Sequence, residues 1–244
     1  MKLMKKIRTL RLKFLFLMAC LRFVKNPNRT EEVFRVSDQL STSERFAAAV
    51  ERLKKAQPGI KTLIEERYRP YAIALDLSHY RPGTLGHSYV QYMQENQLDP
   101  NFYEKLPIDS DVNYIRTRMR ETHDFWHVIL DFKTDPTGEA GLATAYVAQL
   151  GSPVMALVAG LLVVHAVLYD ISNVPSYFSN LARGWELGSS CRSLLAMRWE
   201  ERLHTSLDEL RGELGIHGFF SGSTELNPLA RPESSSSAGA GAGG

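Results

Sequence analysis

The sequence has few of the residues on which secreted, disulfide-stabilised and strand-based proteins depend. Its 244 residues include only two cysteines, Cys20 and Cys191, and no C-x-x-C pair. This excludes a disulfide framework and a paired-cysteine zinc site, and it favours a reducing compartment. The alternation of apolar and polar residues that is typical of strands is nearly absent, and apolar residues recur instead every three or four positions. The sequence therefore predicts an all-α fold.

Acidic residues are missing from the start of the chain. Residues 1–25 carry eight lysines and arginines, and the first acid is Glu31, so this arm has a charge of +8. The other 21 basic and 27 acidic residues leave a net charge of −6 on the rest of the chain. A basic arm on an acidic body predicts that one end of the protein meets an anionic surface. It makes the body a poor candidate for binding nucleic acid.

The arm has the pattern of an amphipathic helix over residues 1–27. Its apolar residues follow spacings of three and four, at Leu3, Ile7, Leu10, Phe14, Leu17, Leu21 and Val24. Such a helix can lie in the headgroup region of a membrane, with its cations near anionic lipid. Two alternatives are a mitochondrial transit peptide and a further helix packed on the body. The longest apolar run of the arm, "FLFLMACL", is too short to span a bilayer.

Residues 28–220 are predicted to form one domain, because nothing within them reads as a linker. Residues 140–169 contain no Asp, Glu, Lys or Arg, and "GSP" at 151–153 divides them. The run after this break, residues 154–169, falls below the usual spanning length, which favours a core helix or the lining of an apolar cavity. Residues 221–244 end in "SSSSAGAGAGG" and are predicted to be a disordered tail.

The stretch "HDFWHVILDFKTDPTGE" suggests a metal site. On a helix, His123 and His127 lie one turn apart and can reach one ion, while Asp124 projects about 100° around the axis. Pro136 and Gly138 break the helix, so the next helix can fold back and bring Glu139 to the site. Two imidazoles and a carboxylate suit zinc, and also manganese or iron. The alternative is that these residues are polar packing in a buried helix.

Other chemistries have weaker support in the sequence. A zinc peptidase would have glutamate as its base at the position of Asp124. A phosphohydrolase built on a His-Asp pair would need further ligands, and His87, His165 and Asp170 have no spacing that supports this role. No flavin or nicotinamide fingerprint occurs. An oxidative step would therefore need the metal, dioxygen or a partner enzyme.

The form H-D-x-x-H, eleven residues and then E resembles the metal-binding signature of the coenzyme Q biosynthesis protein 4 family. The resemblance runs from about residue 60 to residue 217. It includes "LGHSYVQYM" at 85–93, "YIRTRMRETHD" at 114–124 and "ARGWELGSSCRSLL" from residue 182. Met119 replaces a tyrosine that the family pattern leads us to expect. We expect the basic arm and the Ser/Ala/Gly tail to lie outside the family's core.

The resemblance implies a ligand set and a cellular setting. It carries His123, Asp124, His127 and Glu139 over as ligands of a divalent metal, zinc first, with iron, manganese or magnesium as alternatives. It implies an all-α protein at a membrane surface, on the cytoplasmic face in a bacterium or on the matrix side of the mitochondrial inner membrane in a eukaryote. The implied partners are a polyprenyl lipid or quinone precursor, other quinone-biosynthesis enzymes and a second copy in a homodimer.

Two roles follow from the resemblance. One is a lyase activity, the metal-dependent oxidative decarboxylation of a 4-hydroxy-3-methoxy-5-polyprenylbenzoate or a similar compound, with hydroxylation at the same ring carbon. The other is a non-catalytic scaffold that binds the lipid and organises the biosynthetic enzymes. Three arginines precede the metal helix motif, and we expect Arg118 or Arg120 to bind the anionic head group of the ligand.

Overall fold

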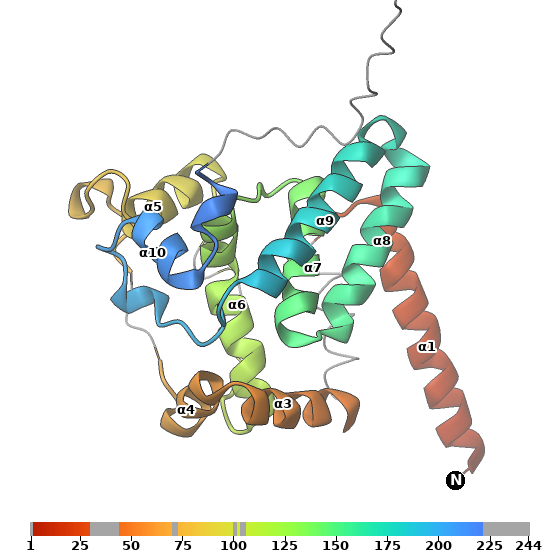
Figure 1. Cartoon of the computed structure of the whole chain (residues 1–244). Helices are drawn as coiled ribbons and strands as arrows, with labels where there is room; N and C mark the ends of the chain where they lie inside the picture. Colours follow the sequence, from red (N-terminus) through yellow and green to blue (C-terminus); the bar gives the residue numbers. More distant parts are fainter. Residues whose placement is uncertain (1, 30–43, 70–72, 100–101, 103–105, 222–244) are drawn as a thin grey trace, which may run out of the picture.

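The structure is a computed structural model that describes residues 2–29, 44–69, 73–99, 102 and 106–221 (Figure 1). The predicted tail, from residue 222 onward, lies outside the described residues. All regular structure in the described part is helical, and the one β-type contact is an isolated bridge between Thr84 and Ser206. The predicted all-α fold is confirmed.

The helices follow the breaks that the sequence predicts. The α-helices are α1 (Lys2–Lys25), α3 (Glu44–Ala56), α4 (Pro58–Glu66), α5 (Leu85–Glu95), α6 (Asp111–Leu130), α7 (Pro136–Leu150), α8 (Pro153–Tyr169), α9 (Val174–Ser190) and α10 (Leu207–Leu214). Four 3-10 turns complete the described part: η1 (Leu77–His79), η2 (Ile171–Asn173), η3 (Trp199–Glu201) and η4 (His217–Phe219). An irregular stretch and η3 separate α9 from α10.

Local capping chemistry fixes the helices around the predicted site. The Ser110 hydroxyl accepts a hydrogen bond from the Asn113 backbone N–H and begins α6. Asp135 accepts from the N–H groups of Thr137 and Gly138 at the start of α7. Between α7 and α8, Gly151 has a left-handed backbone with φ of 59°, which ends the first helix. The chain therefore turns sharply at both ends of α7.

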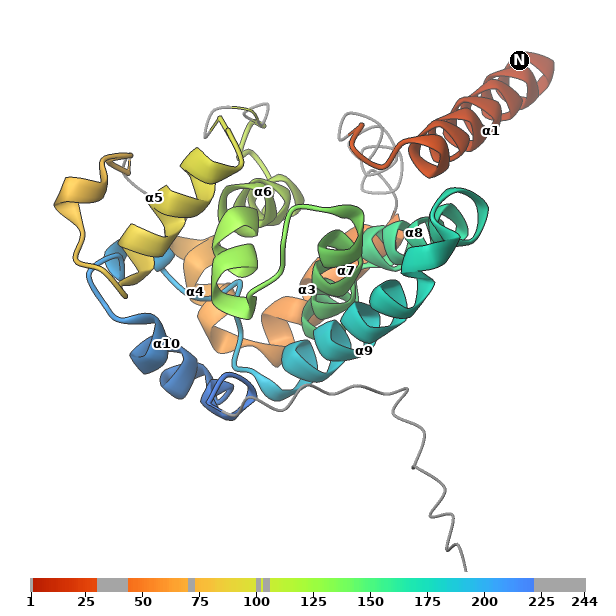
Figure 2. The ribbon, with the colours of Figure 1, turned by 90° about the horizontal axis from the view of Figure 1, so that it is seen from above.

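Helix α7 lies at the centre of the molecule, with α6 on one side and α8 and α9 on the other (Figures 1 and 2). Glycines allow α9 to approach α7 closely. A Cβ on Gly184 would collide with the Gly141 carbonyl oxygen, and one on Gly188 would lie 2.8 Å from the Ala145 carbonyl oxygen. On the α6 side, the Trp126 ring stacks on Tyr146 with 3.9 Å between centroids.

Helix α1 packs along α8 mainly with residues outside the predicted apolar stripe. Its buried residues are Ala19, Cys20, Phe23 and Val24, whereas Leu10, Phe14, Leu17 and Leu21 of the predicted stripe are 53–69% exposed. The prediction of a helix is confirmed, and the packed-helix alternative holds for its C-terminal end. Within the described residues, no helix has the length and apolarity that a membrane span needs.

Candidate metal centre

Two helix ends bring the predicted ligands together. His123 and His127 face the same way from the last two turns of α6. The helix ends at Asp131, which has a left-handed φ of 56°, and the chain reverses before Pro136 opens α7. This puts Glu139 in the first turn of α7, where the helix dipole favours a carboxylate. The fold-back that the sequence predicted is therefore present.

The three side chains converge on one point. The Nε2 atoms of His123 and His127 lie 3.2 Å apart, and the Glu139 carboxylate oxygens lie 3.2 Å from His127 Nε2 and 3.8 Å from His123 Nε2. Ligands bound at the usual zinc distances in a tetrahedron lie about 3.3 Å from one another. The spacing and the chemistry of these donors therefore fit a divalent ion, and the group could hold a metal.

The ring of His127 is oriented by a backbone group. Its Nδ1 lies 3.0 Å from the Phe132 carbonyl oxygen. A carbonyl only accepts, so we assign a proton to Nδ1, and Nε2 is then the ring atom directed at Glu139 and His123 and the one that would bind a metal. The other side of the ring stacks on Tyr92, with 5.5 Å between centroids. Metal-binding histidines are commonly held by such an outer hydrogen bond.

The charges of the group depend on one another. Burial alone would raise the pKa of Glu139, but the charges and hydrogen bonds of His127 and His123 hold it well below its ordinary value. Burial alone would lower the pKa of His123, but the hydrogen bond and charge of Glu139 raise it. The exposed part of Glu139 faces the cavity and not the outer surface of the protein. The pKa values of Glu139 and His123 are therefore both shifted at a site with little contact with bulk water. The group favours an ionised carboxylate beside a positive charge.

Asp124 does not join this group. It is half-buried and lines the same cavity, but the three clustered ligands are His123, His127 and Glu139. The physical reason is its position about 100° around α6 from His123. Burial raises the pKa of its carboxyl group. Asp124 as a fourth ligand therefore remains a prediction, and the structure gives it a position beside the donor group.

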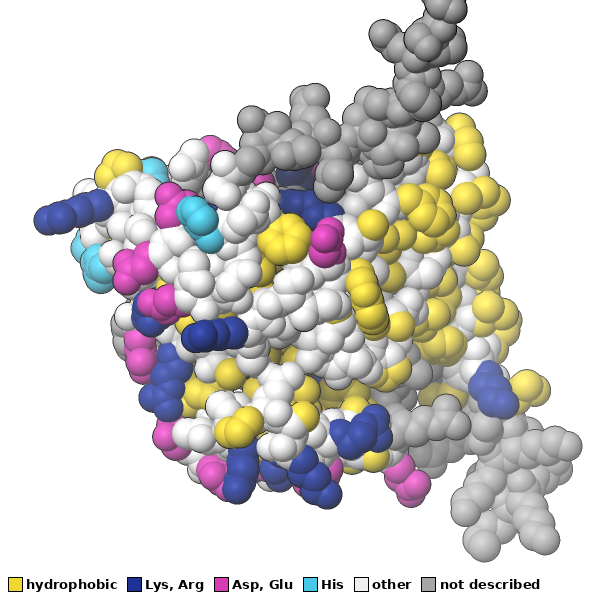
Figure 3. Space-filling model, in the orientation of Figure 1, with side chains coloured by type: hydrophobic (Ala, Val, Ile, Leu, Met, Phe, Trp, Pro, Cys, Tyr) yellow, Lys and Arg dark blue, Asp and Glu magenta, His cyan; other side chains and the backbone are white. Residues whose placement is uncertain are grey.

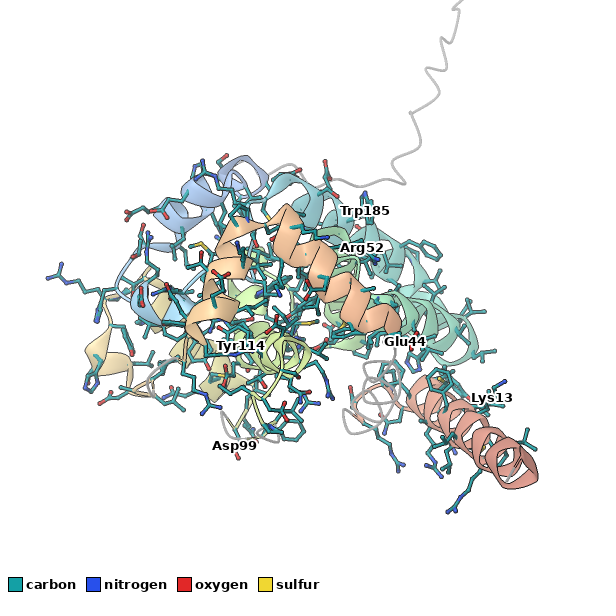
Figure 4. The ribbon with its side chains drawn as sticks, turned by 90° about the horizontal axis from the view of Figure 1, so that it is seen from below. Lys13, Glu44, Arg52, Asp99, Tyr114 and Trp185 are labelled. Atoms are coloured by element: carbon teal, nitrogen blue, oxygen red, sulfur yellow. The ribbon has the colours of Figure 1, made fainter. Side chains whose placement is uncertain are left out.

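The donor group opens into a cavity of about 610 Å³, a size typical of small-molecule sites. The walls change character along the cavity. Near the donors they include Arg116 and Arg120, and towards α8 they become apolar, with Phe23, Ala143, Val154, Met155, Val158 and Leu162. The charge-free stretch 140–169 does line an apolar cavity, as one of its two interpretations predicted. Figure 4 shows Asp99, another lining residue, at the edge of the molecule.

The two arginines predicted for the head group are separated by the helix. Arg120 lines the cavity. Arg118 points into the core, where it is 1% exposed and donates to the Glu200 carboxylate at 2.6 Å and to the Met197 carbonyl at 2.5 Å. The structure thus gives Arg118 an internal partner and no place in the cavity wall. Positions two apart on a helix do not share a face, so Arg116 accompanies Arg120 instead.

Comparison with known proteins places this site in a family. Residues 4–219 match the family described as coenzyme Q (ubiquinone) biosynthesis protein Coq4. The chain belongs to the Coq4 family. The match begins at residue 4, so the basic arm lies within it; the expectation that the arm stood outside the family's core is wrong. The shared name ties the protein to ubiquinone biosynthesis.

Individual relatives agree with this membership. The chain is 29% identical over 200 residues to the mitochondrial ubiquinone biosynthesis protein COQ4 homolog of Danio rerio, covering 79% of this chain and 72% of that protein. It is 30% identical to mitochondrial COQ4 of Lachancea thermotolerans, covering 73% of this chain but only 56% of that protein. A crystal structure of a candidate ubiquinone biosynthesis protein from Nostoc punctiforme is 31% identical, with a TM-score of 0.74, over 84% of this chain and 98% of that one.

Several cavity residues of this Coq4-family chain escaped prediction from sequence. Phe23, Tyr92 and Tyr146 line the cavity from three different helices. Each is an aromatic residue at helical spacing, and such residues are far more often core than site. The one available signal was proximity: Tyr146 follows Glu139 by two helical turns and lies on the same face of α7.

Proposed function

We propose that this chain is a metal-dependent enzyme of ubiquinone biosynthesis that oxidatively removes the ring carboxylate of a polyprenylated hydroxybenzoate. One observation carries the proposal: the donor group of His123, His127 and Glu139 opens into a cavity that is otherwise mostly apolar. Structural zinc sites are closed by four protein ligands, whereas catalytic sites keep a position open. Three donors beside a cavity support the catalytic kind of site.

The donor set limits which metal ions can bind at this site. Two histidines and one carboxylate suit zinc, and with open positions they are also the donor set of ferrous oxygenases. A bound ion supplies a Lewis acid for the phenolate or carboxylate of the ligand, and ferrous iron additionally supplies a site for dioxygen. In the net reaction the carboxylate leaves as carbon dioxide and a hydroxyl group takes its place on the ring. This is a two-electron oxidation of the substrate: water supplies the new hydroxyl group, and dioxygen accepts the two electrons and leaves as hydrogen peroxide.

The chain's own side chains have distinct tasks in this proposal. Arg120 and Arg116, at the polar end of the cavity, can bind a carboxylate through parallel hydrogen bonds. Asp124 follows His123 on α6 and lines the same cavity, and in this proposal its carboxyl group exchanges a proton with the ring hydroxyl. The apolar walls from α7 and α8 hold the prenyl tail and exclude water from the ring.

The first test is metal content, measured by elemental mass spectrometry on the wild type, His127→Ala and His87→Ala. We expect about one equivalent in the wild type. We expect a loss in His127→Ala and no change in His87→Ala, which removes a half-buried histidine outside the donor group. The loaded protein is then incubated with a polyprenylated 4-hydroxy-3-methoxybenzoate and dioxygen. Release of carbon dioxide with a hydroxylated ring supports the proposal, and metal binding without turnover argues against it.

A scaffold that binds the lipid and organises other enzymes is the second candidate. Large aromatic side chains on α9 favour it, because Phe178 and Trp185 are each 55% exposed and could contact a protein partner. Figure 4 shows Trp185 on the outside of this helix. A Glu139→Ala variant that keeps its partners but loses product would support catalysis. A Trp185→Ala variant that loses partners while product formed by the isolated protein is unchanged would support the scaffold.

The cellular setting is part of the same proposal. The relatives from Danio rerio and Lachancea thermotolerans are named as mitochondrial, and we propose the matrix side of the inner membrane for a eukaryotic chain and the cytoplasmic face for a bacterial one. Peripheral attachment through α1 is supported by its exposed leucines and its basic residues. Deletion of residues 1–25 should release the protein from anionic vesicles, and unchanged binding would contradict this attachment.

A further inference from the structure

Helix α1 forms one wall of the cavity. The Phe23 side chain is buried and packs in the same cluster as Ala143, Val158 and Leu162, which line the apolar end of the cavity. Its principal packing partner is α8. Among the described residues, α1 therefore covers the apolar end of the cavity. Removing α1 from α8 would open the cavity along its apolar side.

The connection between α1 and the body is short. Among the side chains of α1 that the structure describes, those that are buried lie in its last two turns: Ala19, Cys20, Phe23 and Val24. One side chain of α8 reaches the α1 backbone, since His165 Nδ1 lies 2.7 Å from the Val24 carbonyl oxygen. The rest of α1 projects beyond the body (Figure 2). The short buried segment makes this a wall of the cavity that can separate at low cost.

The outside of this wall is apolar and basic. Apolar side chains run down one edge of the molecule, over the end of α8 and along α1 (Figure 3). They are exposed residues of the two helices and of η2: Leu10, Leu12, Phe14, Leu15, Leu17, Leu21, Val164, Val167, Leu168, Tyr169 and Ile171. Neither α1 nor α8 contains an Asp or Glu, and α1 bears exposed cations such as Lys13, which points away from the body (Figure 4).

These features fit one occupant. Clustered leucines with a tyrosine and flanking cations match the interface of an anionic bilayer, where the apolar groups enter the acyl boundary and the cations meet the headgroups. We propose that this face docks on an anionic membrane and that α1 is the wall through which the apolar tail of the ligand passes from the bilayer into the cavity. This rests on the proposed function, which makes the ligand a polyprenyl compound.

A covalent bridge tests the passage. Leu157 and Leu161 of α8 pack against Ala19 and Cys20 of α1, so Leu157→Cys and Leu161→Cys each offer a thiol opposite Cys20. A short bis-thiol reagent bridges α1 to α8, with the bridge confirmed by mass spectrometry. The same variants treated with the monofunctional analogue of the reagent are the matched controls. The probe is 3-geranylgeranyl-4-hydroxybenzoate in phosphatidylglycerol vesicles, and its uptake is followed after the protein is separated from the vesicles.

Bridging should slow uptake by about tenfold or more relative to the monofunctional control, as expected for a route whose opening step is raised by 1.4 kcal/mol or more. Metal content should be unchanged. Equal uptake by bridged and control protein would overturn the passage between α1 and α8. No uptake by any form, bridged or unbridged, would instead refute the proposed function, so the two failures are distinguishable.

A second measurement tests the docking face. Leu17→Glu should weaken binding to phosphatidylglycerol vesicles by about tenfold, because one leucine no longer leaves water. Leu75→Glu is the matched control, because Leu75 is an exposed leucine shortly before η1. The orange-yellow segment before α5, to which η1 belongs, lies at the opposite edge of the molecule from α8 (Figure 1). Equal binding by the two variants would overturn the docking face. The docking face would also be overturned if a second copy of the chain covers it. That outcome would be seen as a stable dimer in vesicle-free solution that the Leu17→Glu substitution dissociates.

Discussion

Substitution of Arg118 by methionine should strongly destabilise the fold. The guanidinium and the Glu200 carboxylate are 1% and 2% exposed, with two contacts of 2.6 and 3.2 Å between them. Arg118→Met leaves the Glu200 carboxylate buried without its partner, and such losses cost about 3–5 kcal/mol. For a protein of this size that corresponds to a fall in Tm of about 6–20 °C.

Urea denaturation followed by circular dichroism measures the effect. The double variant Arg118→Met/Glu200→Leu should recover most of the lost stability, because it removes the stranded charge as well. Arg116→Met is the matched control, since Arg116 is half-buried at the cavity, and it should cost less than about 1 kcal/mol.

The opposite pattern would refute the reasoning. Suppose that the free energy of unfolding of Arg118→Met is within about 1 kcal/mol of the wild-type value, and that the variant loses affinity for the carboxylate of the ligand. Arg118 would then face the ligand, and its ion pair would not hold α6 to η3. Arg118 would then bind the anionic head group, as the sequence led us to expect.

Three further predictions concern packing, charge and the cavity. Gly184→Ala should destabilise the protein by about 3 kcal/mol because its Cβ meets the α7 backbone, whereas Gly160→Ala, which meets nothing, should stabilise α8 by up to about 1 kcal/mol; urea denaturation measures both, and equal effects would contradict the close approach. In metal-free protein, Glu139→Gln should lower the free energy of unfolding most at pH values between the ordinary pKa of Glu139, 4.5, and the raised pKa of His123. The ion pair needs an ionised carboxyl and a protonated imidazole, so its contribution is lost as pH falls through the lowered pKa of Glu139 or rises through that of His123; denaturation across pH tests this, and a pH-independent loss would count against it. Val158→Phe should fill the apolar end of the cavity and weaken binding of a prenylated hydroxybenzoate, but leave metal content and binding of 4-hydroxybenzoate itself unchanged; calorimetry decides, and parallel losses for both ligands would point to general misfolding.

Much of the helix layout was predictable because its causes are local. Ser110 caps α6, Pro136 opens α7 and the Gly151 break divides α7 from α8, and each acts on residues within one helical turn. The pair of His123 and His127 was predictable for the same reason, since the helical period fixes their common face. Glu139 needed one more step, the reversal of the chain between α6 and α7, which Pro136 and Gly138 made evident.

The partners of side chains across the fold were not predictable in this way. Arg118 and Arg120 are alike in sequence, and only the position of η3 against α6 decides which of them is buried with Glu200. In the same way the apolar stripe of α1 was evident from the sequence, but which of its apolar residues become buried was not. Ala19 and Phe23 meet α8, while Leu10 and its neighbours stay exposed, because the angle at which α1 leaves α8 depends on the whole helical body.

The sequence by itself determined the all-α class, the helix ends around the site and two histidines on one face of α6, because capping, helical period and chain breaks act over a few residues. The tertiary structure decided that Arg118 is buried with Glu200 while Arg120 lines the cavity, that Phe23 of α1 packs at the apolar end of the cavity, and that the charge-free helices line this cavity. These outcomes depend on how α1, α6, α7 and α8 pack together, and packing between helices distant in sequence is set by the shapes of many side chains at once.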